Sequence, residues 1–252
     1  PDDLKVCFTF QSKYLGMSPW ECPALFTILP YIEHAFGIYH TRGGLNAISL
    51  AMAKIVEEEG GTINTSAPVK RILVENRAAC GVELENGERI TCDDVIINAD
   101  FGYAMTQLFE PGQLRKYTPQ KVGRMKYSCS TFMLYLAVDT VYDNLPHHNI
   151  VFSRDYKKNI RQITDTLEVP DDPSIYIQNA SVTDPTVAPE GKSTIYILVP
   201  MTNNTDGEHW EETLGAYRDK VIDIAMNRGG LTNLSSHIID ERIVTPRDWE
   251  DE

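Results

Sequence analysis

The spacing of apolar positions changes along the chain and predicts helices first, then short strands, then a mixture of both. Residues 1–34 carry many large apolar side chains and few charges, and we expect them to be helical, with Pro30 kinking or ending a helix. In residues 45–59 the apolar positions recur at spacings of three and four, as on one face of a helix. These positions are Leu45, Ile48, Met52, Ile55 and Val56. Gly60 and Gly61 are expected to end that helix.

Residues 69–98 alternate with a shorter period and predict a β-meander. Its expected strands are short and rich in β-branched side chains: "VKRILVE", "AACGVELE", "ERIT" and "DVIIN". Asn86-Gly87 lies between two of them and is a strong signal for a two-residue hairpin loop. The meander ends at Asn98-Ala99-Asp100, where the pattern returns to that of a helix.

The rest of the chain mixes both periodicities and predicts a second layer of helices and strands. Helices are expected at 101–109, 155–166 and 210–227, and strands at 129–138, 149–153, 174–180 and 193–200. This succession of elements predicts a second α/β layer with an antiparallel-leaning sheet. The predicted fold class is therefore mixed α/β, of the α+β kind.

Composition narrows the class of protein. With 252 residues, 42% of them apolar and 23% charged, the chain is typical of a soluble globular protein of one large or two modest domains. A net charge of -13 with no cluster of Lys and Arg excludes a nucleic-acid-binding surface. The 5 cysteines are scattered without metal-site or disulfide spacing, which favours the cytosol. The sequence contains no apolar run of about 18 residues, so no membrane-spanning helix is predicted.

Motifs alone reveal no complete active site and no metal site. His147 and His148 are adjacent, so in a strand their side chains would face opposite ways, and we expect them to be structural or solvent-facing. Four further pairs are typical of turns rather than of paired catalytic carboxylates. They are Asp93-Asp94, Asp171-Asp172, Asp184-Pro185 and Asn203-Asn204. The chain contains no G-x-G-x-x-G, P-loop, G-x-S-x-G or H-E-x-x-H sequence.

The order of longer blocks is more informative than any single motif. In sequence, they are "HTRGGLNAISLAMAKIVEEEGGTINTSAPVKRI", "DDVIINAD", "LPHHNIVFSRDYKKNI", "SVTDPTVAPEGKSTIYILVP" and "RIVTPRDWED". These blocks resemble, in order and over essentially the whole chain, the phytoene desaturase family of bacteria and fungi. That family is the carotenoid branch of the amine-oxidase-like FAD flavoproteins.

The resemblance implies a division of the chain into interleaved parts. Residues 1–40 would form the helical part of a substrate domain, and residues 41–100 an inserted portion of the FAD-binding domain. Residues 101–235 would form the sheet and helices of the substrate domain, and residues 236–252 would return toward the FAD-binding domain. The oligomeric state is not indicated by the sequence.

The resemblance also implies an activity and its partners. It indicates an enzyme that removes hydrogen from adjacent saturated carbons of a polyisoprenoid such as phytoene, in carotenoid biosynthesis. Because two electrons must be removed, FAD is expected to carry the reaction. Apolar residues within 1–38 and 127–138 suit a tunnel for a polyene, although each one by itself is more often a core residue. A substrate that resides in the bilayer implies a cytoplasmic protein bound peripherally to the membrane surface, with residues 1–38 as the expected contact.

Seven residues are expected near the cofactor on the strength of the resemblance. The backbone of Val69 would contact the adenine, and Asn98, Ala99 and Asp100 would lie near the adenine dinucleotide. Arg42, Gly43 and Gly44 would form the crossing between the two domains. The simpler interpretations are an ordinary strand residue at Val69, a helix N-cap at Asp100, and a tight turn with a solvated Arg42.

The Gly-rich segments that flank this region in the family are missing from the chain, so we expect an internal piece of the enzyme that is inactive alone. Two alternatives stay open. One is a related flavoprotein, namely a carotenoid ketolase, an isomerase or a retinol-saturase-like reductase. The other is a non-catalytic module that binds an apolar ligand or a membrane surface.

Overall fold

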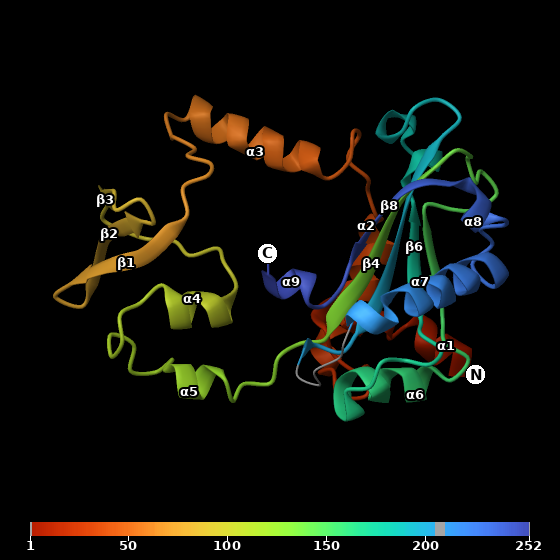
Figure 1. Cartoon of the computed structure of the whole chain (residues 1–252), viewed down its shortest axis with the longest axis horizontal. Coiled ribbons are helices and arrows are strands. Elements are labelled where there is room, and N and C mark those ends of the chain that lie inside the picture. Colours follow the sequence, from red (N-terminus) through yellow and green to blue (C-terminus); the bar gives the residue numbers. More distant parts are fainter. Residues whose placement is uncertain (1, 205–209, 252) are drawn as a thin grey trace. The chain divides into compact units, whose positions relative to one another are not determined.

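The computed structural model describes residues 2–204 and 210–251, which form two compact units (Figure 1). The larger unit contains the residues up to Leu50 and those from Ser128 onward, and the smaller unit is Ala51–Tyr127. Helices and antiparallel strands are mixed, as predicted. The division expected from the resemblance, into substrate-domain and FAD-binding parts with boundaries at 40/41, 100/101 and 235/236, stays a prediction.

The larger unit is built on a five-stranded sheet in the order β5-β6-β7-β4-β8, in which every neighbouring pair is antiparallel. Its strands are β4 (Ser130–Val138), β5 (His148–Val151), β6 (Ile175–Asn179), β7 (Ser193–Met201) and β8 (Ile238–Val244). The remaining helical elements after β4 are α6 (Tyr156–Arg161), the π turn η3 (Gln162–Thr166), η4 (Ala180–Val182), η5 (Pro185–Val187), α7 (Trp210–Asn227), α8 (Leu234–His237) and α9 (Asp248–Asp251).

One face of this sheet carries the main hydrophobic core, against α7. Alternate residues of each strand point to the same face, so the buried positions recur with a period of two. The core includes Phe132, Leu134, Ile177, Ile197, Val221 and Ala225, all fully buried. Truncating a buried Leu such as Leu134 to Ala in a core of this kind costs about 2–5 kcal/mol. Burial of this face therefore fixes the register of the sheet.

The opposite face of the sheet is more polar and partly open. Tyr135 and Tyr196 lie with ring centroids 6.0 Å apart, and Tyr196 lies 5.6 Å from Tyr176. A cavity of about 310 Å³ opens on this side. Its lining includes Tyr135, Gln178, Thr194, Tyr196, Asp240 and Arg242.

The N-terminal segment is helical, as predicted, but in short pieces: α1 (Asp2–Cys7), η1 (Phe10–Leu15), η2 (Ala24–Thr27) and α2 (Ile28–Phe36). Of the two effects expected of Pro30, it does not end a helix, because it lies inside α2 (Ile28–Phe36), whereas a kink at this position stays a prediction. It occupies the first turn, where a backbone N–H has no partner within the helix, so its missing N–H costs little.

The smaller unit contains a three-stranded antiparallel sheet, two helices and the C-terminal part of a third helix that begins in the larger unit. The helix α3 (Asn46–Glu58) leads into β1 (Val69–Glu75), β2 (Ala78–Leu84) and β3 (Arg89–Thr91), followed by α4 (Phe101–Gln107) and α5 (Pro119–Val122). The hairpin predicted at Asn86-Gly87 joins β2 and β3, and Gly87 has a φ of 86°. Asn76 and Arg77, with φ of 50° and 67°, make a second tight loop between β1 and β2.

The expected fourth strand, "DVIIN", does not form. The backbone of residues 92–100 is irregular, and Ile96 is 93% exposed. Val95 packs against a small core of Ile72, Ala104 and Leu108. An apolar run makes a strand only where another strand pairs with it, and within the described residues of this unit β3 ends the sheet.

Candidate functional site

The Arg42–Gly44 turn precedes α3 and has a backbone that requires glycine. Gly44 N–H donates to the Thr41 carbonyl at 2.9 Å. Gly43 and Gly44 have φ of 84° and 88°, in the left-handed region where a side chain is strained. A Cβ added at either position would meet no atom within 4 Å, so the space beside the turn is open. A ligand can therefore approach this backbone closely.

The carboxylate of Asp184 lies directly behind this turn. Its Oδ2 accepts a hydrogen bond from Gly43 N–H at 2.6 Å and lies 3.3 Å from His40 Nε2. Its Oδ1 accepts from the Thr186 N–H at 3.0 Å and from the Thr186 hydroxyl at 2.5 Å. The hydroxyl of Thr186, and then the N–H groups of Gly43 and Thr186, hold the pKa of Asp184 far below its usual range. Asp184 is therefore a carboxylate at neutral pH.

Two adjacent histidines extend this cluster. The rings of His147 and His148 lie 4.2 Å apart, and His40 lies 4.9 Å from His147. β5 begins only at His148, so the two residues do not lie in a strand together and their rings are not directed to opposite faces. His147 Nδ1 lies 3.0 Å from the Thr183 hydroxyl. Burial first, and then the neighbouring His148 and His40, lower the pKa of His147 to about 4, so its ring is neutral at pH 7.

The three histidines do not form a metal centre. Across residues 2–204 and 210–251, no three His, Cys, Asp or Glu side chains are grouped as metal ligands. His148 Nδ1 instead contacts the Tyr176 hydroxyl at 2.5 Å, toward the open face of the sheet. The three residues thus connect the Arg42–Gly44 turn to that face.

Val69 and residues 98–100 lie in the smaller unit. Val69 begins β1, opposite Leu84, and packs against the small core. β1 is an edge strand, so part of its backbone is directed away from β2. One outward group is already used, since Ile72 N–H donates to the Leu108 carbonyl at 2.8 Å. These positions are compatible with a backbone contact at Val69, which stays a prediction.

Asp100 is the N-cap of α4, the simpler of its two interpretations. Its Oδ1 accepts from Tyr103 N–H at 2.8 Å. Asn98 and Ala99 are exposed and lie in the irregular stretch before the helix. Their contact with a dinucleotide stays a prediction.

The residues proposed to line a polyene tunnel separate into two groups. Within 127–138, Phe132, Leu134, Leu136 and Val138 belong to the main core, so the core interpretation holds for them. Tyr135 lies on the open face. Within 1–38, several large apolar side chains are exposed instead. These are Leu4, Phe8, Trp20, Leu25, Tyr31 and Phe36.

The range 127–138 included Tyr135, but sequence reasoning missed Tyr176 and Tyr196 of the open face and the contact of Asp184 with Gly43. A signal for the tyrosines was present: Tyr135, Tyr176 and Tyr196 occupy the alternate positions of three strands whose other positions are core residues. Burial raises the pKa of Tyr176 and of Tyr196 above that of free tyrosine. Both hydroxyls are therefore neutral hydrogen-bonding groups.

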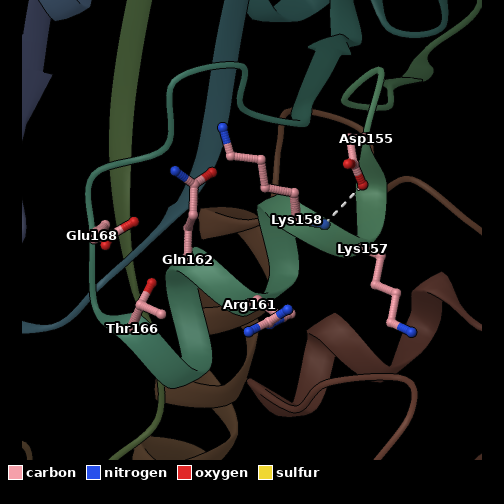
Figure 2. A pocket seen from close by; sticks show the side chains of 7 residues that line it. All are labelled: Asp155, Lys157, Lys158, Arg161, Gln162, Thr166 and Glu168. Carbon is pink, nitrogen blue, oxygen red and sulfur yellow. Dashed lines mark hydrogen bonds between the residues drawn. The ribbon is translucent and has the colours of Figure 1, made fainter.

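A charged cavity of about 380 Å³ lies apart from this cluster, along α6 and η3 (Figure 2). Its lining is Asp155, Lys157, Lys158, Arg161, Gln162, Thr166 and Glu168. Asp155 caps α6 by accepting from Lys158 N–H at 2.9 Å, and Lys158 Nζ pairs with Asp171 at 3.0 Å. Exposed charges of both signs line this cavity and Lys158 is already paired, so we do not take it as the candidate site.

Comparison with solved structures establishes the fold. A protein of Pyrococcus furiosus matches with a TM-score of 0.61 and 18% identity, covering 96% of this chain and 53% of its own. An oxidoreductase of Methanosarcina mazei matches with a TM-score of 0.59 and 18% identity, covering 94% and 51%. At this identity the likeness concerns the fold alone.

Sequence relatives are closer, and they are carotenoid desaturases. A 4,4'-diapophytoene desaturase (4,4'-diapolycopene-forming) of Methylomonas is 53% identical over 249 residues, covering 99% of this chain and 48% of the relative. An all-trans-zeta-carotene desaturase of Myxococcus xanthus is 37% identical, covering 100% and 48%. A phytoene desaturase of Neurospora crassa is 34% identical, covering 99% and 44%. The chain thus spans about half the length of these relatives.

The family model of the flavin-containing amine oxidoreductases matches residues 2–252. This agrees with the blocks that run through the sequence and with the carotenoid desaturases among its relatives. The chain belongs to the flavin-containing amine oxidoreductase family.

Proposed function

We propose that the full-length protein containing this chain is an FAD-dependent desaturase of an acyclic polyisoprenoid, such as phytoene or 4,4'-diapophytoene, in carotenoid biosynthesis. The observation that carries the proposal is the 53% identity over 249 residues to a 4,4'-diapophytoene desaturase. The family match over residues 2–252 supports a flavin as the redox group. FAD would accept the two electrons that a protein side chain cannot hold.

The chain's own residues are proposed to bind and orient rather than to react. The open space beside Gly43 and Gly44 fits a cofactor lying against the backbone, and the exposed Arg42 offers a positive charge to its phosphates. Val69 would contact the adenine through its backbone, with Asn98, Ala99 and Asp100 nearby. The tyrosine-lined face of the five-stranded sheet would form one wall of the substrate site.

The proposed setting is the cytoplasmic surface of a membrane. Within the described residues, every helix is too short or too polar to cross a bilayer. The exposed apolar side chains of residues 1–38, with Leu25 at 75% exposure, would dock the protein peripherally. A substrate that resides in the bilayer would enter from that side.

The test is expression of the full-length gene in a bacterial host engineered to accumulate phytoene or 4,4'-diapophytoene. We expect more highly conjugated products, identified by chromatography and absorbance, and a purified protein with flavin absorbance that floats with liposomes. Oxygenated or isomerised products without added double bonds would instead indicate a ketolase or an isomerase. Absence of both flavin and product would favour the non-catalytic alternative.

A further inference from the structure

We infer that Asp184 is a positioning residue that holds the Arg42–Gly44 turn in its cofactor-facing conformation, an inference that rests on the proposed function. Asp184 lies 141 residues after Gly43 in sequence, yet its Oδ2 is 2.6 Å from the Gly43 nitrogen. Its side chain is 4% exposed, so the bond is shielded from competing water. The carboxylate contacts the turn from behind and is not itself placed to react.

The backbone of Asp184 is held by the segment that directly follows a strand of the five-stranded sheet. Asp184 N–H donates to the carbonyl of Ala180 at 3.0 Å, and Ala180 follows β6 directly. On the far side, Oδ1 is occupied by both donors of Thr186. The position of Oδ2 is thus determined by a rigid element, and Gly43 is attached to it.

A second layer supports the same contact. His40, with 12% of its side chain exposed, lies beside Oδ2 and packs its ring on His147. His147 in turn contacts Thr183, the residue before Asp184. We call His40, His147, Thr183 and Asp184 the turn clamp. The turn clamp brings together two short motifs that are far apart in the sequence, His147-His148 and Thr183-Asp184-Pro185.

The turn clamp restricts the conformational freedom of Gly43 and Gly44. Two consecutive glycines can adopt many backbone conformations, so fixing them in one conformation costs conformational entropy. Because no atom lies within 4 Å of the Cβ positions of Gly43 and Gly44, packing does not restrain them. Gly44 is held by backbone hydrogen bonds to Thr41 and Ala47. The hydrogen bond to Asp184 adds the side-chain restraint on Gly43 and so prepares the turn for a ligand.

The variant Asp184→Asn in the full-length protein tests the inference. An amide presents one accepting oxygen, so it cannot satisfy both Gly43 and Thr186, and its NH₂ group opposes a donor. We expect the Gly43 amide to exchange with deuterium roughly 10- to 100-fold faster, the range for a charge-assisted hydrogen bond. FAD affinity, measured by fluorescence titration of the apoprotein, should fall at the same time.

Thr186→Val is the matched control, because it removes a donor to Oδ1 and leaves the Oδ2 contact intact. Its backbone N–H still donates to Oδ1, so its Gly43 exchange and its FAD affinity should change much less than those of Asp184→Asn. His40→Phe keeps a ring on His147 but removes one neighbour of Oδ2, and should speed Gly43 exchange about 5-fold. This second variant decides the matter should Asp184→Asn not fold.

Unchanged Gly43 exchange in folded Asp184→Asn and His40→Phe would overturn the inference. So would faster exchange with undiminished FAD affinity, because the turn would then be clamped for some purpose other than the cofactor. Failure of the proposed function looks different: the wild-type protein itself would bind no FAD, while the exchange experiment would still report on the clamp.

Discussion

His147 is a residue whose protonation the fold opposes. Its pKa falls from 6.5 to about 4 through burial, His148 and His40. Between pH 6.5 and about 4, the unfolded chain therefore binds a proton at His147 that the folded protein does not bind. The contribution of His147 to stability is fully present above pH 6.5 and is lost as the pH falls toward 4. The negative charge of Glu33 raises the pKa of His148, but Glu33 is not among the groups that shift the pKa of His147.

We predict that the melting temperature of the full-length protein falls as the pH is lowered from 7 to 4.5, and that His147→Asn reduces this fall. Asparagine retains a polar side chain of similar reach but does not titrate. Thermal scans of both proteins across that range give the comparison. An identical pH dependence in the two proteins would show that folding does not lower the pKa of His147.

At the scale of elements, the edge strand β1 carries a prediction about backbone recognition. If Val69 contacts the adenine through its main chain, Val69→Ile should leave FAD affinity nearly unchanged in the full-length protein. Val69→Pro removes the N–H and restricts φ, and should weaken binding about 5-fold or more. Fluorescence titration with FAD, on variants first shown by circular dichroism to be folded, measures both. Equal affinities would exclude the backbone contact.

Elements defined by local periodicity could be predicted from the sequence. The helix of residues 210–227, the strands around 130–138 and 193–201, and the Asn86-Gly87 hairpin all follow from spacing or turn chemistry. The run "DVIIN" could not, because a strand depends on a partner that its own residues do not specify. Pro30 does not end a helix because it lies in the first turn of α2, a position that its sequence alone did not reveal.

The candidate site shows the same limit. Gly43-Gly44 signals a turn by itself, since two left-handed residues require glycine. Asp184 also signals a turn, and it does cap η5. Its bond to Gly43 spans 141 residues and arises only when β6 and the segment before α3 are brought together. Contacts of that separation leave no local pattern in a single sequence.

At the scale of the whole molecule, apolar surface is left uncovered where a core would be expected. The predicted apolar positions of α3, Leu45, Ile48, Met52, Ile55 and Val56, are all exposed, and Ile96 is nearly fully so. Each is typical of a surface that packs against other secondary structure. We propose that the other half of the full-length protein covers them, in keeping with relatives about twice as long.

The last prediction concerns the 252-residue chain by itself. A dinucleotide is held chiefly where its pyrophosphate meets the N–H groups of a Gly-rich turn at a helix N-terminus, and the chain contains no G-x-G-x-x-G sequence. The contacts proposed at Val69, at Asn98–Asp100 and beside the Arg42–Gly44 turn would offer too little to offset the freedom lost on binding. We therefore expect the isolated chain to purify colourless and to convert no phytoene even with FAD added.

Its exposed apolar surface should also make the isolated chain associate with itself at concentrations where the full-length protein remains dispersed. Absorbance scans through the flavin bands and light scattering of both proteins, prepared in parallel, provide the measurement. The full-length protein serves as the control, since it should carry yellow flavin under the same conditions. Flavin bound at one equivalent to the isolated chain would mean that residues 1–252 hold the whole cofactor site, and that the turn, β1 and Asp100 contribute far more to binding than their contacts suggest.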